Sequence, residues 1–260
     1  MPTAPARQLW QRIETIHAVT YFAPESIDAA RAAGLRGFWM GYFGFRACPL
    51  GAVGPEPVEA AFANFAGPMV ARSLPDAWTF ARPERLRVIR ATAAAAALRR
   101  CSVSGLASDD PVVRLWQHCT TLREHRGDGH VAALAAAGIE GCEAHLLLAA
   151  DQGIDPQVFL EHRGWSDAQH EAARDRLVGR GLLNDGELTD AGRALRADVE
   201  TTTDRIAAEP FLRSIGERSL LDAIDALTPL AIEIATSGVL PFPNPMGLPP
   251  LAADRGFDDR

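Results

Sequence analysis

The sequence contains no lysine, has only four cysteines and lacks a long hydrophobic run. All 26 basic residues are therefore arginines, a bias typical of GC-rich coding that carries no information about function. The cysteines are not set in the Cys-x-x-Cys pairs of zinc ribbons, iron–sulfur sites or disulfide scaffolds, so we expect reduced structural thiols at Cys48, Cys101, Cys119 and Cys142. No segment approaches the ~20 apolar residues of a membrane span, and the first residues lack the apolar core of a secretion signal. These absences predict a cytoplasmic protein.

The overall composition is that of an ordinary globular protein, with 47% hydrophobic and 23% charged residues in 260. This length suffices for two modest domains or one large one. The net charge is −7, whereas a protein that binds duplex DNA normally presents a basic face to the phosphates. The charge of the whole chain weighs against DNA binding, although a local arginine patch can coexist with an acidic remainder.

Hydrophobic periodicity predicts a mostly helical fold, because apolar residues recur three and four positions apart in five segments. These segments are 9–18, 58–74, 86–98, 112–122 and 220–234. One β-hairpin is predicted over 181–189, where Asp185-Gly186 supplies the turn. We expect a helical domain with a ligand pocket over 1–138, a winged helix-turn-helix over 139–208, a C-terminal helix over 209–239 and a Pro-rich tail over 240–260.

The pattern between 139 and 207 predicts three short helices, the hairpin and a longer helix. The first two helices are expected at about 143–151 and 156–161, followed by a turn at Gly164. Ser166 is a suitable N-cap for a third helix that runs from 167 to 180 and ends at Gly181. Thr189 is expected to cap the last helix, over 190–207. This order is typical of a winged helix-turn-helix.

The run 180–195 resembles the end of the recognition helix, the wing and the following helix of regulators of the multiple-antibiotic-resistance (MarR) type. In that family the early part of the third helix enters the major groove and a basic wing tip touches the minor groove or the backbone. The resemblance therefore implies that retained DNA contacts would come from Gln169, His170 and Arg174.

Four carboxylates occupy positions that would face the duplex in such a regulator. Asp167 and Glu171 lie at the start of the third helix, and Asp185 and Glu187 lie at the wing tip. Each would meet the negative field of the phosphates unfavourably. We therefore predict that duplex binding has been lost, and that the unit serves as a packing or dimerisation module, ahead of the alternative of direct DNA recognition.

Almost the whole chain also resembles a group of actinobacterial proteins labelled helix-turn-helix. The resemblance is carried by the segments 17–22, 34–43, 74–78, 123–130 and 240–246. The segment 101–111 is shorter than in that group, which makes different packing expected there. The resemblance to this group implies a helix-turn-helix fold but does not imply a ligand or a reaction.

Glycines and aromatic residues alternate in a predicted helix over 37–44. Gly37, Gly41 and Gly44 make one thin face that lets another backbone or a flat ligand approach. Aromatic side chains fill the rest of the helix, and we favour core packing over a ligand wall for the set Phe38, Trp39, Tyr42, Phe43 and Phe45. Arg46 ends the run and is placed to meet an anionic group.

The segment 116–130 concentrates ionisable residues. His118 and His125 are seven residues apart and project from one helix face. Gly127 and Gly129 are predicted to break the helix, so that Asp128 caps the next one. A haem or metal site, an acid–base pair and an anion-binding corner are all open, although the spacing matches no established metal signature.

The alternative for this segment is a buried polar hinge that binds nothing, in which Arg123, Arg126 and Asp128 hydrogen-bond between domains. If a pocket exists, Arg123, His125 and His130 should face it beside the aromatic helix, with a volume of order 300 Å³ or more. Other polar residues embedded among apolar ones are expected to converge there as well: His17, Asn64, Arg72 and Asp76.

The leading hypothesis is a small-molecule-binding protein of regulator ancestry, dimeric through terminal helices such as 220–234. The first rival is an enzyme that uses haem or a metal bound by His118, His125 or His130. A DNA-binding winged-helix regulator and a purely structural module are the remaining alternatives.

Overall fold

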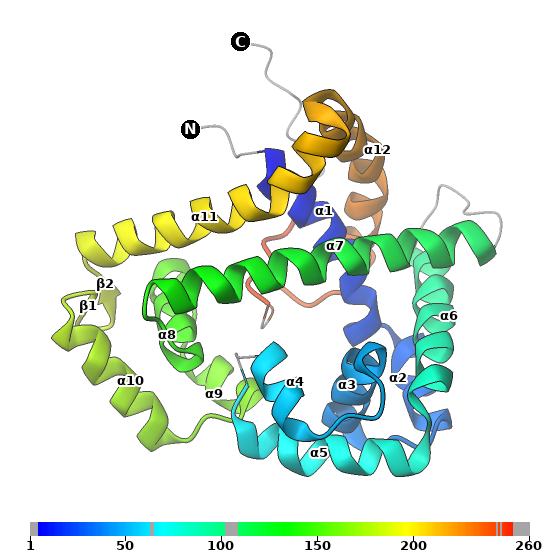
Figure 1. Cartoon of the computed structure of the whole chain (residues 1–260), viewed down its shortest axis with the longest axis horizontal. Coiled ribbons are helices and arrows are strands. Elements are labelled where there is room, and N and C mark those ends of the chain that lie inside the picture. Colours follow the sequence, from blue (N-terminus) through cyan, green and yellow to red (C-terminus); the bar gives the residue numbers. More distant parts are fainter. Residues whose placement is uncertain (1–4, 63–64, 102–108, 243, 245, 252–260) are drawn as a thin grey trace.

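The computed structural model describes residues 5–62, 65–101, 109–242, 244 and 246–251. Its described part is mostly helical, with one two-stranded sheet (Figure 1). The first half contains α1 (Pro5–Phe22), α2 (Pro24–Ala32), α3 (Gly37–Ala47), a 3₁₀ turn η1 (Cys48–Leu50), α4 (Pro55–Ala61), α5 (Gly67–Phe80), α6 (Pro83–Cys101) and α7 (Asp109–Ala136). The second half contains α8 (Gly141–Gln152), α9 (Gln157–Arg163), α10 (Asp167–Gly179), β1 (Leu183–Asn184), β2 (Glu187–Leu188), α11 (Asp190–Ser214) and α12 (Gly216–Thr236).

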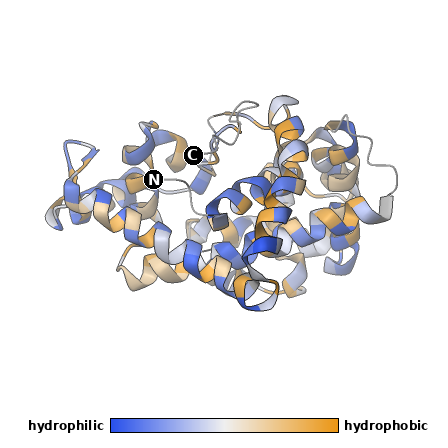
Figure 2. Ribbon diagram, turned by 90° about the horizontal axis from the view of Figure 1, so that it is seen from above, coloured by the Kyte–Doolittle hydropathy of each residue, from blue (hydrophilic) through white to orange (hydrophobic). Residues whose placement is uncertain are grey.

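The helix α7 crosses the whole molecule and organises the rest around it (Figure 1). It packs against α1, α6 and α11. The main core lies where α1, α6, α7 and α12 meet, and its buried side chains include Ile16, Leu98, Trp116 and Ile224. Apolar and polar residues are interspersed along the helices (Figure 2).

The predicted single helix over 58–74 is wrong, because two helices, α4 and α5, occupy this part of the chain. Pro68 stands in the first turn of α5 and has no N–H to donate to the preceding turn. Proline is tolerated at that position because the first N–H groups of a helix have no intrahelical partner. The Gly67-Pro68 pair therefore starts a new helix instead of continuing the old one.

The predicted helix break at Gly127 and Gly129 is also wrong, because α7 runs through both glycines. A Cβ atom on Gly129 would lie 2.8 Å from Cγ2 of Ile206 on α11, whereas one on Gly127 would meet nothing within 4 Å. Glycine at 129 thus allows α7 and α11 to approach closely. Asp128 and His130 accordingly lie inside a helix and not at the start of one.

The helices and the hairpin predicted between 139 and 207 are confirmed in type and order. The Ser166 side chain accepts a hydrogen bond from the backbone N–H of Gln169 (3.3 Å), and the Gln169 side chain accepts one from the backbone of Ser166 (2.9 Å). At the turn, Asp185 has φ 50° and Gly186 has φ 84°, as the Asp-Gly pair predicts. The last helix of this set, α11, extends to Ser214, past its predicted end.

Among the described helices, none is both long and apolar enough to cross a membrane by itself. The pair formed by 111–136 and 141–152 meets the length and composition requirement only when taken together across a 99° bend.

Candidate functional site

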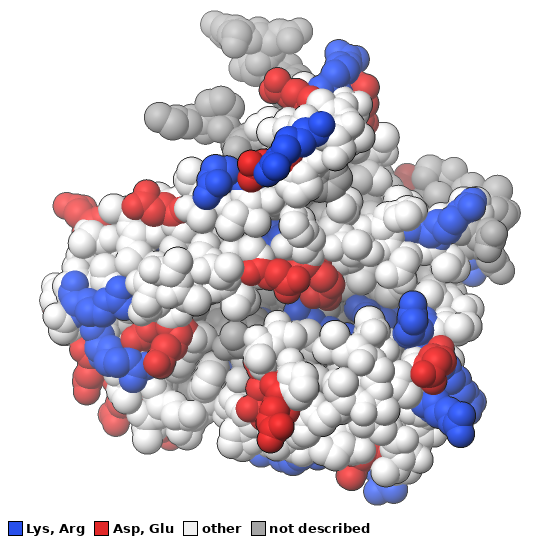
Figure 3. Space-filling model, viewed as in Figure 1, with Lys and Arg blue, Asp and Glu red and all other residues white. Residues whose placement is uncertain are grey.

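A cavity of about 1370 Å³ lies between helices of the first half of the chain and the helices α8, α9 and α11 of the second half. Its wall contains residues of α1, α3, α7, α8, α9 and α11, and of the C-terminal segment after α12. Figure 3 shows the molecule hollowed beneath α7, with blue arginine atoms inside the hollow. The volume exceeds the ~300–1,000 Å³ of most small-molecule sites.

The aromatic helix α3 packs into the core with one side and lines the cavity with another. Phe43 and Phe45 are buried in the core, whereas Phe38, Trp39 and Tyr42 line the cavity. The thin glycine face is used for helix packing, because Cβ atoms on Gly41 and Gly44 would lie 3.2 Å and 3.3 Å from the methyl groups of Ala30 and Ala77. Core packing and a ligand wall thus occupy different sides of the same helix.

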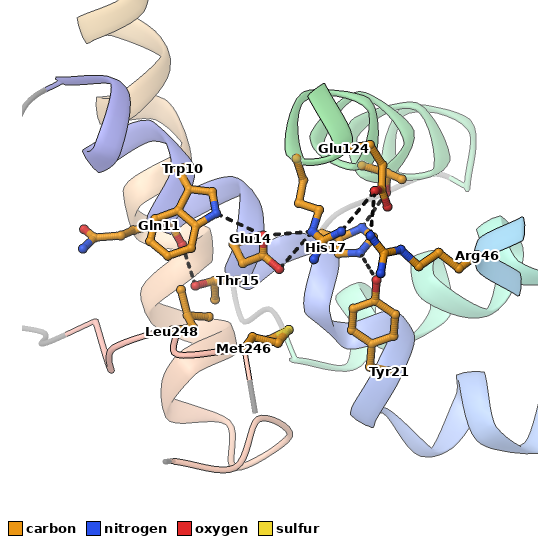
Figure 4. A network of polar contacts seen from close by, with 12 residues as sticks. Trp10, Gln11, Glu14, Thr15, His17, Tyr21, Arg46, Glu124, Met246 and Leu248 are labelled. Atoms are coloured by element: carbon orange, nitrogen blue, oxygen red, sulfur yellow. Dashed lines mark hydrogen bonds and ion pairs between the residues drawn. The ribbon is translucent and has the colours of Figure 1, made fainter. Parts of the chain in front are cut away.

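A buried ion-pair network crosses the cavity wall between α1 and α7 (Figure 4). Arg123 donates from Nε to both carboxylate oxygens of Glu14, at 3.2 Å and 3.1 Å. Trp10 donates from its indole nitrogen to the same carboxylate at 3.1 Å. Arg123 also donates from Nη1 to Oε2 of Glu124 at 3.1 Å. Two helices are therefore joined by an arginine that holds two carboxylates.

Arg46 extends this network from α3. It donates to Oε2 of Glu124 at 3.2 Å and to the hydroxyl of Tyr42 at 2.8 Å, and its guanidinium lies 3.9 Å from the ring centre of Phe62. Burial opposes ionisation of Glu124, but Arg46 and Arg123 outweigh it and hold the pKa of that carboxyl below its ordinary value. Glu124 is therefore ionised and links α3 to α7.

His17 lies behind this wall and not on it. Its Nδ1 hydrogen-bonds to the hydroxyl of Thr120 at 2.9 Å and its Nε2 to that of Tyr21 at 2.8 Å. Burial, followed by the positive charges of Arg123 and Arg90, lowers its pKa well below the ordinary value. His17 is thus a neutral core histidine that holds Tyr21, which does line the cavity.

A second ion-pair cluster lies further along α7. Arg126 donates from Nη2 to Asp204 at 2.9 Å and to Glu200 at 3.2 Å. Arg7 pairs with the same two carboxylates, at 2.8 Å and 2.9 Å. Nε of Arg126 is buried and has no hydrogen-bond partner among the described atoms. The two arginines and two acids balance in charge and fasten α1, α7 and α11 together.

His130 stands at the edge of that cluster, with Nδ1 3.1 Å from the hydroxyl of Thr203 and 4.0 Å from a carboxylate oxygen of Glu200. Burial lowers its pKa, and the negative charge of Glu200 acts in the opposite direction. The imidazole is therefore largely neutral at physiological pH, on the wall of the cavity.

Residues of α8, α9 and the turn before α10 close the opposite side of the cavity. Arg163 is buried, and its guanidinium lies 4.6 Å from the ring centre of Phe65. Trp165 donates to Nδ1 of His145 at 3.1 Å, and His145 stacks on Phe159 with ring centres 5.1 Å apart. Burial and the charge of Arg163 lower the pKa of His145 well below its ordinary value, in agreement with its role as an acceptor.

Seven of the residues that the sequence offered as candidates for ligand binding lie on the cavity wall: Trp39, Tyr42, Arg46, Arg123, Arg126, Asp128 and His130. Asn64 lies outside the described residues. His17 is in the core, and Arg72 and His118 are exposed. Their part in binding stays a prediction.

His125 does not line the cavity, contrary to the prediction. At about 100° per residue, an ideal helix places His118 about 140° around α7 from Arg123, and His125 follows His118 after almost two whole turns. The histidines that share a face therefore share the face turned away from Arg123. His118, His125 and His130 are not brought together, and the described residues include no group of three His, Cys, Asp or Glu side chains placed to hold a metal.

Sequence reasoning missed several residues of the wall, above all Glu14, Trp10 and Arg163. The spacing of Trp10 and Glu14, four apart on α1, is a local signal that pairs them on one face. Their arginine partner is 109 residues away, a distance that no periodicity reveals.

The residues expected to touch DNA lie on α10. Gln169 is exposed but is engaged in the capping box, Arg174 is exposed, and His170 is half-buried. Asp167 and Glu171 are exposed on the same helix. The acidic character predicted for this face is present at its surface.

The described part of the chain is a mostly helical protein in which α8, α9, α10 and the hairpin β1–β2 lie beside a large cavity. The chain belongs to the helix-turn-helix family, whose model matches residues 6–107 and 106–241. No curated protein and no solved structure matches it. The two matched segments meet inside 102–108, which lies outside the described residues, as does most of the segment predicted to be shortened.

Proposed function

We propose that the protein is a small-molecule-binding regulator of MarR-like descent, with its ligand in the 1370 Å³ cavity. The observation that carries this proposal is that both halves of the chain contribute residues to the cavity wall. Aromatic residues of α3 face residues of α8 and α9 across one continuous space. A ligand seated there touches the N-terminal helices and the helix-turn-helix unit together, which is the arrangement a sensor needs.

The contacts between the two sides support a coupling of this kind. The backbone N–H of Ala66 donates to the carbonyl of Arg163 at 3.0 Å, and the Arg163 guanidinium covers Phe65. Trp165 lines the cavity and directly precedes Ser166, the cap of α10. A ligand that favours one spacing between Phe65 and Trp165 would shift the position of α10, provided that it binds the two arrangements with different affinity.

The output of the regulator is proposed to be a protein contact and not duplex binding, since carboxylates dominate the start of α10 and the wing. The partner we expect is a second copy of this chain, in a homodimer. The apolar residues of α12, including Leu220, Ile224 and Ile234, are used against α1 within the chain, so the interface would need other faces of the terminal helices.

Titration with the fluorescent apolar probe anilinonaphthalenesulfonate tests the ligand site. We expect saturable binding of one probe per chain, weakened by Trp39→Ala on the cavity wall. His118→Ala is the matched control, because His118 is exposed on α7 and outside the wall. Absence of saturable binding, or equal loss in both variants, would contradict the proposal. Metal analysis of the same sample tests the haem or metal enzyme.

A DNA-binding regulator is the second candidate, and membership of the helix-turn-helix family favours it. Fluorescence anisotropy with a duplex from the gene's own upstream region separates the two. Salt-dependent nanomolar binding would establish the second candidate in place of the protein-contact output.

A further inference from the structure

The cavity changes its chemistry along α7. At one end its wall contains Arg123 and Arg126, and at the other it contains Leu134 and Ala135. Arg123 and Ala135 are twelve residues apart, so a rise of about 1.5 Å per residue makes the cavity roughly 18 Å long. A site of this length, cationic at one end and apolar at the other, is shaped for an elongated molecule.

The cationic end is built from buried guanidinium groups. The Arg46 side chain is 8% exposed, and its Nε is buried without a hydrogen-bond partner among the described atoms. The planar guanidinium matches the geometry of a carboxylate, and Arg123 and Arg163 stand on the same part of the wall.

The electrostatics of this end agree with an acid ligand. Burial lowers the pKa of Arg163; the hydroxyl of Tyr42 opposes this, and the positive charges of Arg46 and Arg123 add to it. A ligand anion would offset that repulsion. Glu14 and Glu124 belong to the same cluster, so a second acid group on the ligand would meet like charges. One carboxylate fits better than a phosphate or a diacid.

The apolar end lies between α7, α8, α11 and the C-terminal segment. The apolar part of its wall consists of Leu134, Ile139, Ala144, Leu147, Leu148, Leu195, Val199 and Met246. Ionisable residues of α8 and α11 line the cavity beside them, and two of these, Arg196 and Asp151, neutralise each other in an ion pair of 2.9 Å. The C-terminal segment is held against α8, because the side chain of Gln152 donates to the carbonyl of Gly247 at 3.4 Å. A Cβ atom on Gly247 would lie 3.2 Å from Leu148, so the segment forms a close-fitting wall.

We propose that the cavity binds an elongated apolar molecule with a single carboxylate, the acid beside Arg46 and the apolar body along α7 towards Leu134 and Leu148. This inference rests on the proposed function, namely that the cavity is a ligand site. A small aromatic acid alone would leave most of 1370 Å³ unfilled. A long alkyl chain or an extended fused-ring body supplies the same chemistry.

Displacement of anilinonaphthalenesulfonate by hexadecanoate, octanoate, hexadecanol, hexadecylamine and naphthoate tests the inference. Quenching of Trp10, Trp39 and Trp165, all on the wall, gives an independent signal. Hexadecanoate should bind at least about tenfold more tightly than octanoate, hexadecanol or hexadecylamine. If naphthoate binds as tightly as hexadecanoate, the ligand does not need an elongated body and the inference is wrong. If hexadecanol binds as tightly as hexadecanoate, the acid subsite is wrong.

Two variants separate the ends of the site. Arg46→Met should remove the preference for hexadecanoate over hexadecanol. Ala144→Phe should shorten the apolar end, so that hexadecanoate loses affinity and octanoate retains it. His118→Ala should change neither. If circular dichroism shows that Arg46→Met does not fold, the effect of Ala144→Phe still tests the inference. If Ala144→Phe does not weaken hexadecanoate relative to octanoate, the inference is wrong.

Failure of the inference can be told from failure of the proposed function. If the probe binds one per chain but no carboxylate displaces it, the cavity is a ligand site for another chemistry and this inference is wrong. If the probe itself shows no saturable binding, the proposed function falls as well.

Discussion

The two glycines of α7 provide a matched test of how this helix packs. Gly127 and Gly129 lie two residues apart in one helix and share the same helix propensity. A Cβ atom on Gly127 meets nothing within 4 Å, whereas one on Gly129 lies 2.8 Å from Cγ2 and 3.3 Å from Cβ of Ile206. Gly127→Ala and Gly129→Ala therefore differ only in what the new methyl group encounters.

The expected magnitudes follow from two opposing effects. Alanine in a helix interior is about 0.8–1.0 kcal/mol more favourable than glycine, so Gly127→Ala should raise the free energy of unfolding by up to that amount. At 129 the same gain is offset by overpacking, which costs about 1–3 kcal/mol, because the contacting Cγ2 methyl group is attached directly to the branched Cβ of Ile206. Gly129→Ala should therefore be about 1–3 kcal/mol less stable than Gly127→Ala.

Thermal unfolding followed by circular dichroism checks this difference. For a chain of this size about 1 kcal/mol corresponds to roughly 2–4 °C in Tm, so the two variants should differ by several degrees. Equal Tm values would refute the close approach of α7 and α11. Destabilisation by both substitutions would show that the helix is interrupted there, as the glycines suggested before the structure was known.

Three further predictions concern the wing, the ion-pair network and the DNA-facing surface. Gly186→Val should lower the free energy of unfolding by about 1–3 kcal/mol, because Gly186 has φ 84° and a β-branched residue is strained there; an unchanged Tm would contradict it. Glu124 has a depressed pKa in the folded protein, so its stabilising contribution is present above the ordinary glutamate pKa of about 4.3 and declines as the pH falls below it; urea unfolding of Glu124→Gln should show a weaker decline over that range, and an identical decline would count against the network. Random duplex DNA should bind weakly, and Glu171→Arg with Glu187→Arg should strengthen salt-dependent binding in fluorescence anisotropy; no gain would mean that these carboxylates do not face DNA.

The helices and the hairpin between 139 and 207 could be predicted because their signals are local. Ser166 caps a helix that begins one residue later, and Asp185-Gly186 fixes a turn whose strands are its immediate neighbours. Ser166 and Gln169 are three residues apart, and Leu183 pairs with Leu188 five residues further on. Sequence alone therefore suffices for them.

The candidate site could be predicted only in part, because its interactions join distant segments. The conformation around Gly129 depends on Ile206, which no local pattern reveals. Periodicity shows that His118 and His125 share a face of α7, but the packing of α1 and α11 decides which face meets the cavity. The sequence identified Arg123 and Arg46 as unusual, whereas Glu14, the carboxylate partner of Arg123, emerges only when α1 is laid beside α7.

The pairing of the first and last helices has a consequence for how the chain is made. Arg12 on α1 donates to the hydroxyl of Thr228 on α12 at 3.0 Å, across 216 residues of sequence. The apolar side chains of α1 are covered by Leu220, Ile224 and Ile234. During synthesis the side of α1 that packs against α12 therefore stays uncovered until α12 has left the ribosome. Contacts of such large sequence separation are slow to form, so a nascent chain stalled before α12 would expose its apolar surface to chaperones.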